Sequence, residues 1–98
     1  MYKRQVFARG SLPRREVIFV IDKKDRIHVS GGYTSSLGSF GQYKGELYGS
    51  AFEAAGAAID DIIKMRPREI VVLSSDLEML SFIHGRLTEE GVECEWEV

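Results

Sequence analysis

The run Val17–Ile21 constrains the fold most, because it is continuously apolar and rich in β-branched and aromatic residues. Charged residues 14–16 and 22–25 bound it, and five residues are too few for a buried helix. The run therefore predicts a strand that is buried on both faces. The polar turn after it leads into residues 26–30, where apolar and polar side chains alternate. Together the two segments predict a β-hairpin.

The middle of the chain predicts a weaker strand and then a helix. Residues 39–44 carry Phe40 and Tyr43 among glycines, which favours a third strand at an edge of the sheet. Ser50 and Glu53 have the spacing of a capping box, so a helix is expected to start there. Pro67 ends the helical pattern, since proline lacks the amide that a helix needs.

The remaining chain predicts strand, helix and strand. Residues 69–73 are apolar and β-branched, and residues 75–78 form a second capping-box pattern before a helical apolar stripe. Gly91 suits the end of that helix, and residues 92–98 alternate like a strand with one solvent face. The order β-β-β-α-β-α-β predicts one α/β domain over residues 17–98, with a mixed five-stranded sheet and helices packed on it.

Length and composition narrow the class of protein. Ninety-eight residues with 44% hydrophobic and 29% charged side chains are typical of one globular domain. No apolar run approaches the ~18 residues that span a bilayer. Cys94 is the only cysteine, which excludes an internal disulfide and a cysteine zinc site and favours a reducing, cytoplasmic location.

Charge is uneven, although the net charge is only −2. Residues 1–16 are expected to form a basic arm that either follows nucleic-acid phosphates or is a solvated tail. Residues 1–5 also resemble the translation of a transposon end used in sequencing libraries, so part of this arm is expected to be artefactual and the gene metagenomic. Tyrosines near Lys44 could stack on bases. The candidate nucleic-acid-binding residues are Lys3, Arg4, Arg9, Arg14, Arg15 and Lys44.

The element order over residues 17–98 resembles the ribonuclease H-like fold group. That group carries carboxylates at the end of the first strand, at the start of the first helix and after the fourth strand. Asp22, Glu53 and Asp76 match these positions. The resemblance implies a nuclease in which these three residues hold Mg²⁺ or Mn²⁺ and promote hydrolysis of a phosphodiester.

This site needs strands 17–21 and 69–73 to be adjacent and parallel, because Asp22 and Asp76 would then meet at one edge of the sheet. Each carboxylate also has a structural interpretation. Glu53 completes a capping box, Asp76 favours a helix dipole, and Asp22 suits a hairpin turn.

A second register changes the site. Residues 6–11 resemble the first-strand motif of ribonuclease H, with Arg9 in the place of its aspartate. In that register the strand 17–21 is second and Asp22 moves to the opposite edge, so the site loses a ligand and gains a positive charge.

Two non-catalytic classes stay open beside the nuclease. The topology is similar to the ribosomal protein S11 and L18 group, which binds RNA, although a pI near 5.7 disfavours an RNA scaffold. A protein-binding module, such as an inhibitor from a phage or mobile element, could use the acidic helix end and last strand to meet a basic partner.

Overall fold

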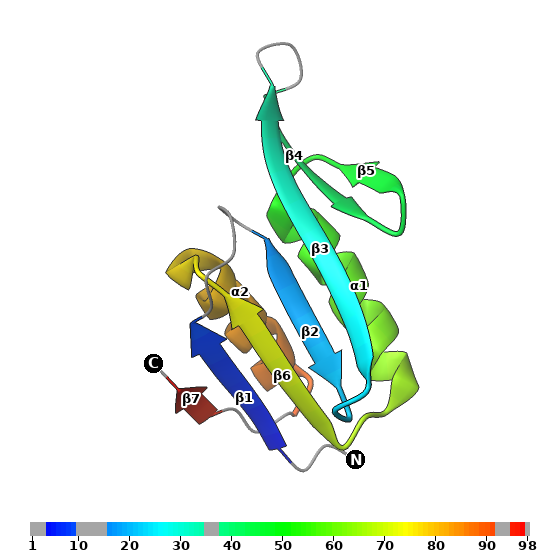
Figure 1. The fold of residues 1–98 in the computed structure, drawn as a ribbon, viewed down its shortest axis with the longest axis vertical. Coiled ribbons are helices and arrows are strands. Elements are labelled where there is room, and N and C mark those ends of the chain that lie inside the picture. Colours follow the sequence, from blue (N-terminus) through cyan, green and yellow to red (C-terminus); the bar gives the residue numbers. More distant parts are fainter. Residues whose placement is uncertain (1–3, 10–15, 35–37, 92–94, 98) are drawn as a thin grey trace.

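The computed structural model describes residues 4–9, 16–34, 38–91 and 95–97. It shows an α/β domain in which two helices pack on a single sheet (Figure 1). The helices are α1 (Ala51–Met65) and α2 (Leu77–Glu89). The strands are β1 (Arg4–Arg9), β2 (Val17–Ile21), β3 (Asp25–Thr34), β4 (Gly38–Tyr43), β5 (Glu46–Tyr48), β6 (Glu69–Ser74) and β7 (Glu95–Glu97).

The sheet has the strand order β5-β4-β3-β2-β6-β1-β7. From β5 to β6 each strand is antiparallel to its neighbour, and β1 is parallel to both β6 and β7. The expected parallel pairing of strands 17–21 and 69–73 is therefore wrong. Residues Arg4–Arg9, expected in a basic arm, form β1 inside the sheet.

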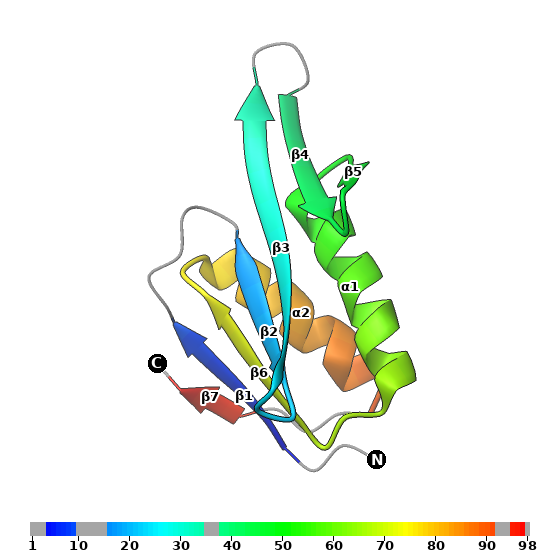
Figure 2. The same ribbon diagram turned by 45° about the vertical axis from the view of Figure 1, so that its right-hand side comes forward.

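Both helices cover the same face of the sheet (Figure 2). Burial alternates along β2, where Val17, Phe19 and Ile21 are buried while Ile18 and Val20 stay partly exposed. The same alternation occurs along β6, with Ile70 and Val72 buried. The prediction that the strand 17–21 is buried on both faces is therefore wrong. One face packs on the helices, and no helix of the described residues covers the other.

Both helices form where the sequence predicts them, and α1 begins for the reason expected, whereas the N-cap of α2 is Asp76 and not Ser75, the first residue of the expected capping box. The Ser50 hydroxyl caps α1 by accepting a hydrogen bond from the Glu53 amide at 3.2 Å. The Glu53 carboxylate reaches back to the Gly49 amide at 2.8 Å, one residue before the cap. Alanines on the inner face of α1 are fully buried, which brings the helix close to β3 and β4.

Candidate functional site

The three predicted carboxylates do not meet at one edge of the sheet. In the antiparallel pair of β2 and β6, Ile21 lies opposite Ile70 and Val17 lies opposite Ser74. Asp22 follows β2 and Asp76 follows β6, so the two residues lie beyond opposite ends of a pairing that is about 16 Å long. Asp22 thus lies at the opposite edge, as the second register expects, and Arg9 is the Cα partner of Ser74 near Asp76. The structure still differs from the second register. That register makes residues 6–11 and 17–21 the first and second strands of the fold, whereas in the sheet β6 lies between β1 and β2.

Backbone amides bind each of the three carboxylates. Asp22 Oδ1 accepts hydrogen bonds from the amides of Arg68 and Glu69 at 2.9 and 3.0 Å. Asp76 is the N-cap of α2, where its Oδ1 accepts from the Glu78 amide at 2.9 Å. Glu53 binds the Gly49 amide. These carboxylates stabilise a turn and two helix starts, which is the structural interpretation of each.

The expected Mg²⁺ or Mn²⁺ site is not assembled by these residues. Among the described residues, no group of three or more histidine, cysteine, aspartate or glutamate side chains is arranged to hold a metal ion.

The expected nucleic-acid-binding residues fall in three places. Lys3, Arg14 and Arg15 lie outside the described residues, and Arg4 and Arg9 are the first and last residues of β1. Lys44 is exposed in the β4–β5 turn, where its Nζ lies 3.3 Å from Asp61 Oδ2 and 5.6 Å from the centre of the Tyr43 ring. Lys44 is therefore paired within its own hairpin and α1.

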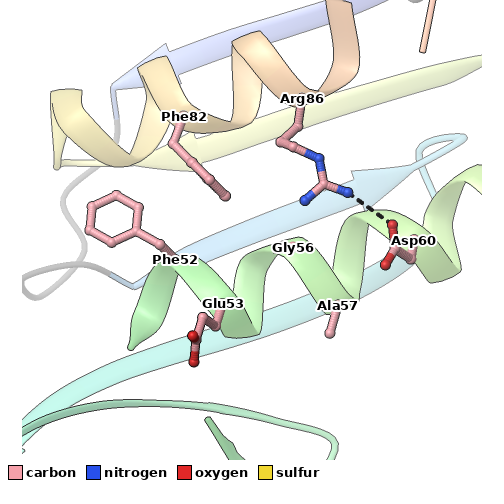
Figure 3. Close-up of a pocket in the computed structure, with 7 residues that line it drawn as sticks. All are labelled: Phe52, Glu53, Gly56, Ala57, Asp60, Phe82 and Arg86. Carbon is pink, nitrogen blue, oxygen red and sulfur yellow. Dashed lines mark hydrogen bonds and ion pairs between the residues drawn. The ribbon is translucent and has the colours of Figure 1, made fainter. Parts of the chain in front are cut away.

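A groove of about 390 Å³ runs between α1 and α2 (Figure 3). Phe52 and Phe82 close one end with their rings edge to face, 5.4 Å between centroids. At the other end Arg86 reaches from α2 across Gly56 and binds Asp60 Oδ1 at 3.0 Å. A Cβ on Gly56 would lie 3.0 Å from the Arg86 guanidinium, so glycine makes room for this ion pair. The groove offers an apolar end and a charged end.

A second, polar hollow of about 350 Å³ lies on the other side of α1, against the β4–β5 hairpin. The Tyr43 hydroxyl donates to Asp61 Oδ2 at 2.6 Å, and Lys44 contacts the same oxygen. The bond from Tyr43 and the bond from Lys44 lower the pKa of Asp61. Burial, followed by the bond to Asp61, raises the pKa of Tyr43 above its usual range.

Sequence reasoning singled out Tyr43, Lys44 and Glu53, but it missed the other residues that shape these hollows. Arg86 and Asp60 come from different helices, so no local spacing reveals their ion pair. In the sequence, Phe52 and Phe82 are simply aromatic residues on amphipathic helices. Core packing produces the same pattern, so it does not indicate a groove.

Comparisons with known proteins add no relative: no family model, no curated protein and no solved structure matches this chain.

Proposed function

We propose that this chain is a non-catalytic interaction module that binds a basic segment of a partner protein along α1 and α2. The observation that carries the proposal is the groove between these helices, which has two aromatic rings at one end and the carboxylate of Asp60, paired with Arg86, at the other (Figure 3). An amphipathic segment that pairs apolar side chains with lysine or arginine is complementary to such a groove.

The charges on the two helices support a basic partner. The helices carry five carboxylates against the two cations Lys64 and Arg86, and Asp60 already neutralises Arg86. The five carboxylates belong to Glu53, Asp60, Asp61, Glu78 and Glu89. Asp61 lies on the other side of α1 from the groove, so the excess belongs to the two helices as a whole. Such an excess attracts positively charged partners and repels acidic ones, which gives specificity as well as faster association.

The aromatic pair supports an apolar anchor. Phe52 and Phe82 are half-buried, so each ring contacts the core and still presents an edge to the groove. Aromatic residues of this kind commonly contribute most of the binding energy of an interface.

The nuclease alternative makes a contrary prediction about metal ions. A module without a metal site should melt at the same temperature with and without Mn²⁺, and should cleave neither DNA, RNA nor their hybrid. A rise in melting temperature on adding Mn²⁺ that is lost in both Asp22→Asn and Asp76→Asn would contradict the proposal and restore the nuclease.

The groove itself can be tested with a synthetic amphipathic peptide of leucine and lysine in isothermal titration calorimetry. Phe82→Ala should weaken binding by roughly 5- to 30-fold, the effect of losing an aromatic anchor worth about 1–2 kcal/mol. Leu47→Ala is a matched control, because Leu47 is 62% exposed and lies in β5, away from the groove. Equal weakening by Leu47→Ala, or no binding of the peptide to the unaltered protein, would contradict the groove as the binding site.

No helix of the described residues is long and apolar enough to cross a membrane.

A further inference from the structure

One aspartate joins two loops at the end of the sheet where β2 ends and β6 begins. The Asp22 amide donates to the Glu69 carbonyl at 3.0 Å, and its carboxylate accepts from the amides of Arg68 and Glu69. The β2–β3 turn and the connection between α1 and β6 therefore lie against each other (Figure 1, bottom). Residues 22–25 and residues 66–69, which are distant in sequence, thus lie together at this end of the sheet.

This place concentrates positive charge, and we call it the basic end. Residues 22–26 and 64–69 carry three carboxylates, on Asp22, Asp25 and Glu69, against six exposed cations. The C-terminal end of α2, with Glu89 and Glu90, comes to the same end of the sheet and leaves the cations in slight excess (Figure 2). The cations are Lys23, Lys24, Arg26, Lys64, Arg66 and Arg68. The chain as a whole has a net charge of −2, so this positive excess is local. Within the described part of the chain, none of the six cations takes part in an ion pair.

Two of these cations occupy backbone conformations that favour glycine. Lys23 has φ 65° and Arg66 has φ 50°, both in the left-handed region. The β2–β3 turn has two residues with positive φ, and the second position of such turns is usually glycine. The β4–β5 turn of this protein follows that rule, with Gly45 after Lys44. At the basic end a lysine and an arginine stand where glycine would be less strained, and local strain of this kind clusters at functional sites.

We propose that the basic end binds the phosphate backbone of a nucleic acid, a function separate from the groove between the helices. Exposed lysine and arginine side chains release condensed counterions when they neutralise phosphates, and the arginine fork matches phosphate geometry. The strain at Lys23 and Arg66 is then explained by the charge that glycine could not supply. An anionic lipid surface fits less well, because such binding also needs apolar side chains to insert. Met65 is the one exposed large hydrophobic residue among those described at this end.

Fluorescence anisotropy with labelled random-sequence oligonucleotides of single-stranded DNA, duplex DNA and RNA tests the proposal. Lys23→Gly and Arg66→Gly should each raise the melting temperature, because glycine relieves the left-handed strain. Each should also weaken binding by roughly tenfold at about 50 mM salt and reduce the slope of log K against log salt by about 0.7–0.9. A gain in stability together with a loss of affinity separates loss of charge from loss of fold.

Lys23→Arg is the matched control, since it keeps the charge and the backbone conformation and should bind as the unaltered protein does. Three results would overturn the proposal. One is glycine variants that bind with unchanged affinity. A second is an unaltered protein that binds none of the oligonucleotides. The third is binding to phosphatidylserine vesicles without binding to any oligonucleotide, which would assign the basic end to membranes.

Discussion

The carboxylate of Asp61 links the polar hollow to the stability of the fold. It accepts hydrogen bonds from Tyr43 and Lys44, and these keep its pKa below the ordinary value of 3.8. A carboxyl with a lowered folded-state pKa stabilises the fold above the pKa of the unfolded chain. That contribution is lost as the pH falls through the lower, folded-state pKa. For Tyr43 the sign is opposite: burial and the bond to Asp61 raise its pKa, so its contribution is present below pH 10.0 and is lost above it.

We therefore expect the free energy of unfolding to decline on both sides of neutral pH. Urea unfolding of the unaltered protein, of Asp61→Asn and of Tyr43→Phe across acid and alkaline pH measures the loss of stability on each side. Asp61→Asn should remove part of the decline in acid, and Tyr43→Phe part of the decline in alkali. The assignment fails if Tyr43→Phe loses stability in alkali as steeply as the unaltered protein does. The acid effect should be small, because the Asp61 side chain is 37% exposed and solvent screens the interaction.

Individual residues were predictable from sequence where their roles are local. Ser50 and Glu53 act within four residues of each other, so their spacing alone indicates the helix start that the structure confirms. Asp76 was expected inside the first turn of a helix and is its N-cap. The partners of Asp22 are 46 and 47 residues away, and no local pattern could identify them.

Two glycines, one in a helix and one in a strand beside a helix, should respond differently to an added side chain. Gly85 lies in α2, where a Cβ would meet no atom within 4 Å outside the neighbouring backbone of its own helix, so Gly85→Ala should gain the helix propensity of alanine, about 0.5–1 kcal/mol. Gly41 lies in β4, where a Cβ would come within 2.3 Å of the Ser50 carbonyl oxygen. Gly41→Ala should therefore displace the start of α1 and destabilise the fold.

Thermal and urea unfolding of these two variants tests this pair. A rise in melting temperature for Gly85→Ala with a fall for Gly41→Ala is expected. A Gly41→Ala variant as stable as the unaltered protein would show that α1 does not depend on close approach to β4.

The helices and the middle strands were predictable because their patterns are local, but the pairing of strands was not. A capping residue, an apolar period and a breaking proline act within one element. Whether two strands are adjacent and parallel depends on the path of the whole chain. Here β1 enters the sheet between β6 and β7, and β2 pairs with β6 in the antiparallel sense. The candidate metal site depended on that pairing, so its three carboxylates do not meet, although both helices and the strands β2, β3, β4 and β6 form where the sequence predicts them.

The molecule as a whole has two layers, the sheet and the helices on one of its faces. The sequence of β2 does not indicate this. A continuous apolar run predicts burial on both faces, yet Ile18 and Val20 share the open face of the sheet with Val71 and Leu73. Cross-strand contacts among these four side chains reduce their exposure without a covering helix.

Two neighbouring valines of β6 allow the packing of the two faces of the sheet to be compared. Val72 is fully buried under the helices, and Val71 is partly exposed on the open face. Val72→Ala should lower the free energy of unfolding by about 2–3 kcal/mol, because it removes two methyl groups and leaves a cavity. Val71→Ala should cost less than about 1 kcal/mol, since its side chain loses less contact with the protein. Urea unfolding of both variants measures this, and equal losses would mean that the open face is packed as tightly as the core.

The contacts of Asp22 also bear on the order in which this chain acquires its structure. The left-handed conformations at Asp22 and Lys23 carry a steric cost, and the hydrogen bonds from the amides of Arg68 and Glu69 to Asp22 can offset it only once β6 lies beside β2. A peptide excised around the β2–β3 hairpin lacks those amides, so it should stay unstructured in water. We therefore expect this hairpin to form late in folding, and the cations on its turn to meet those of residues 66–68 only in the native state.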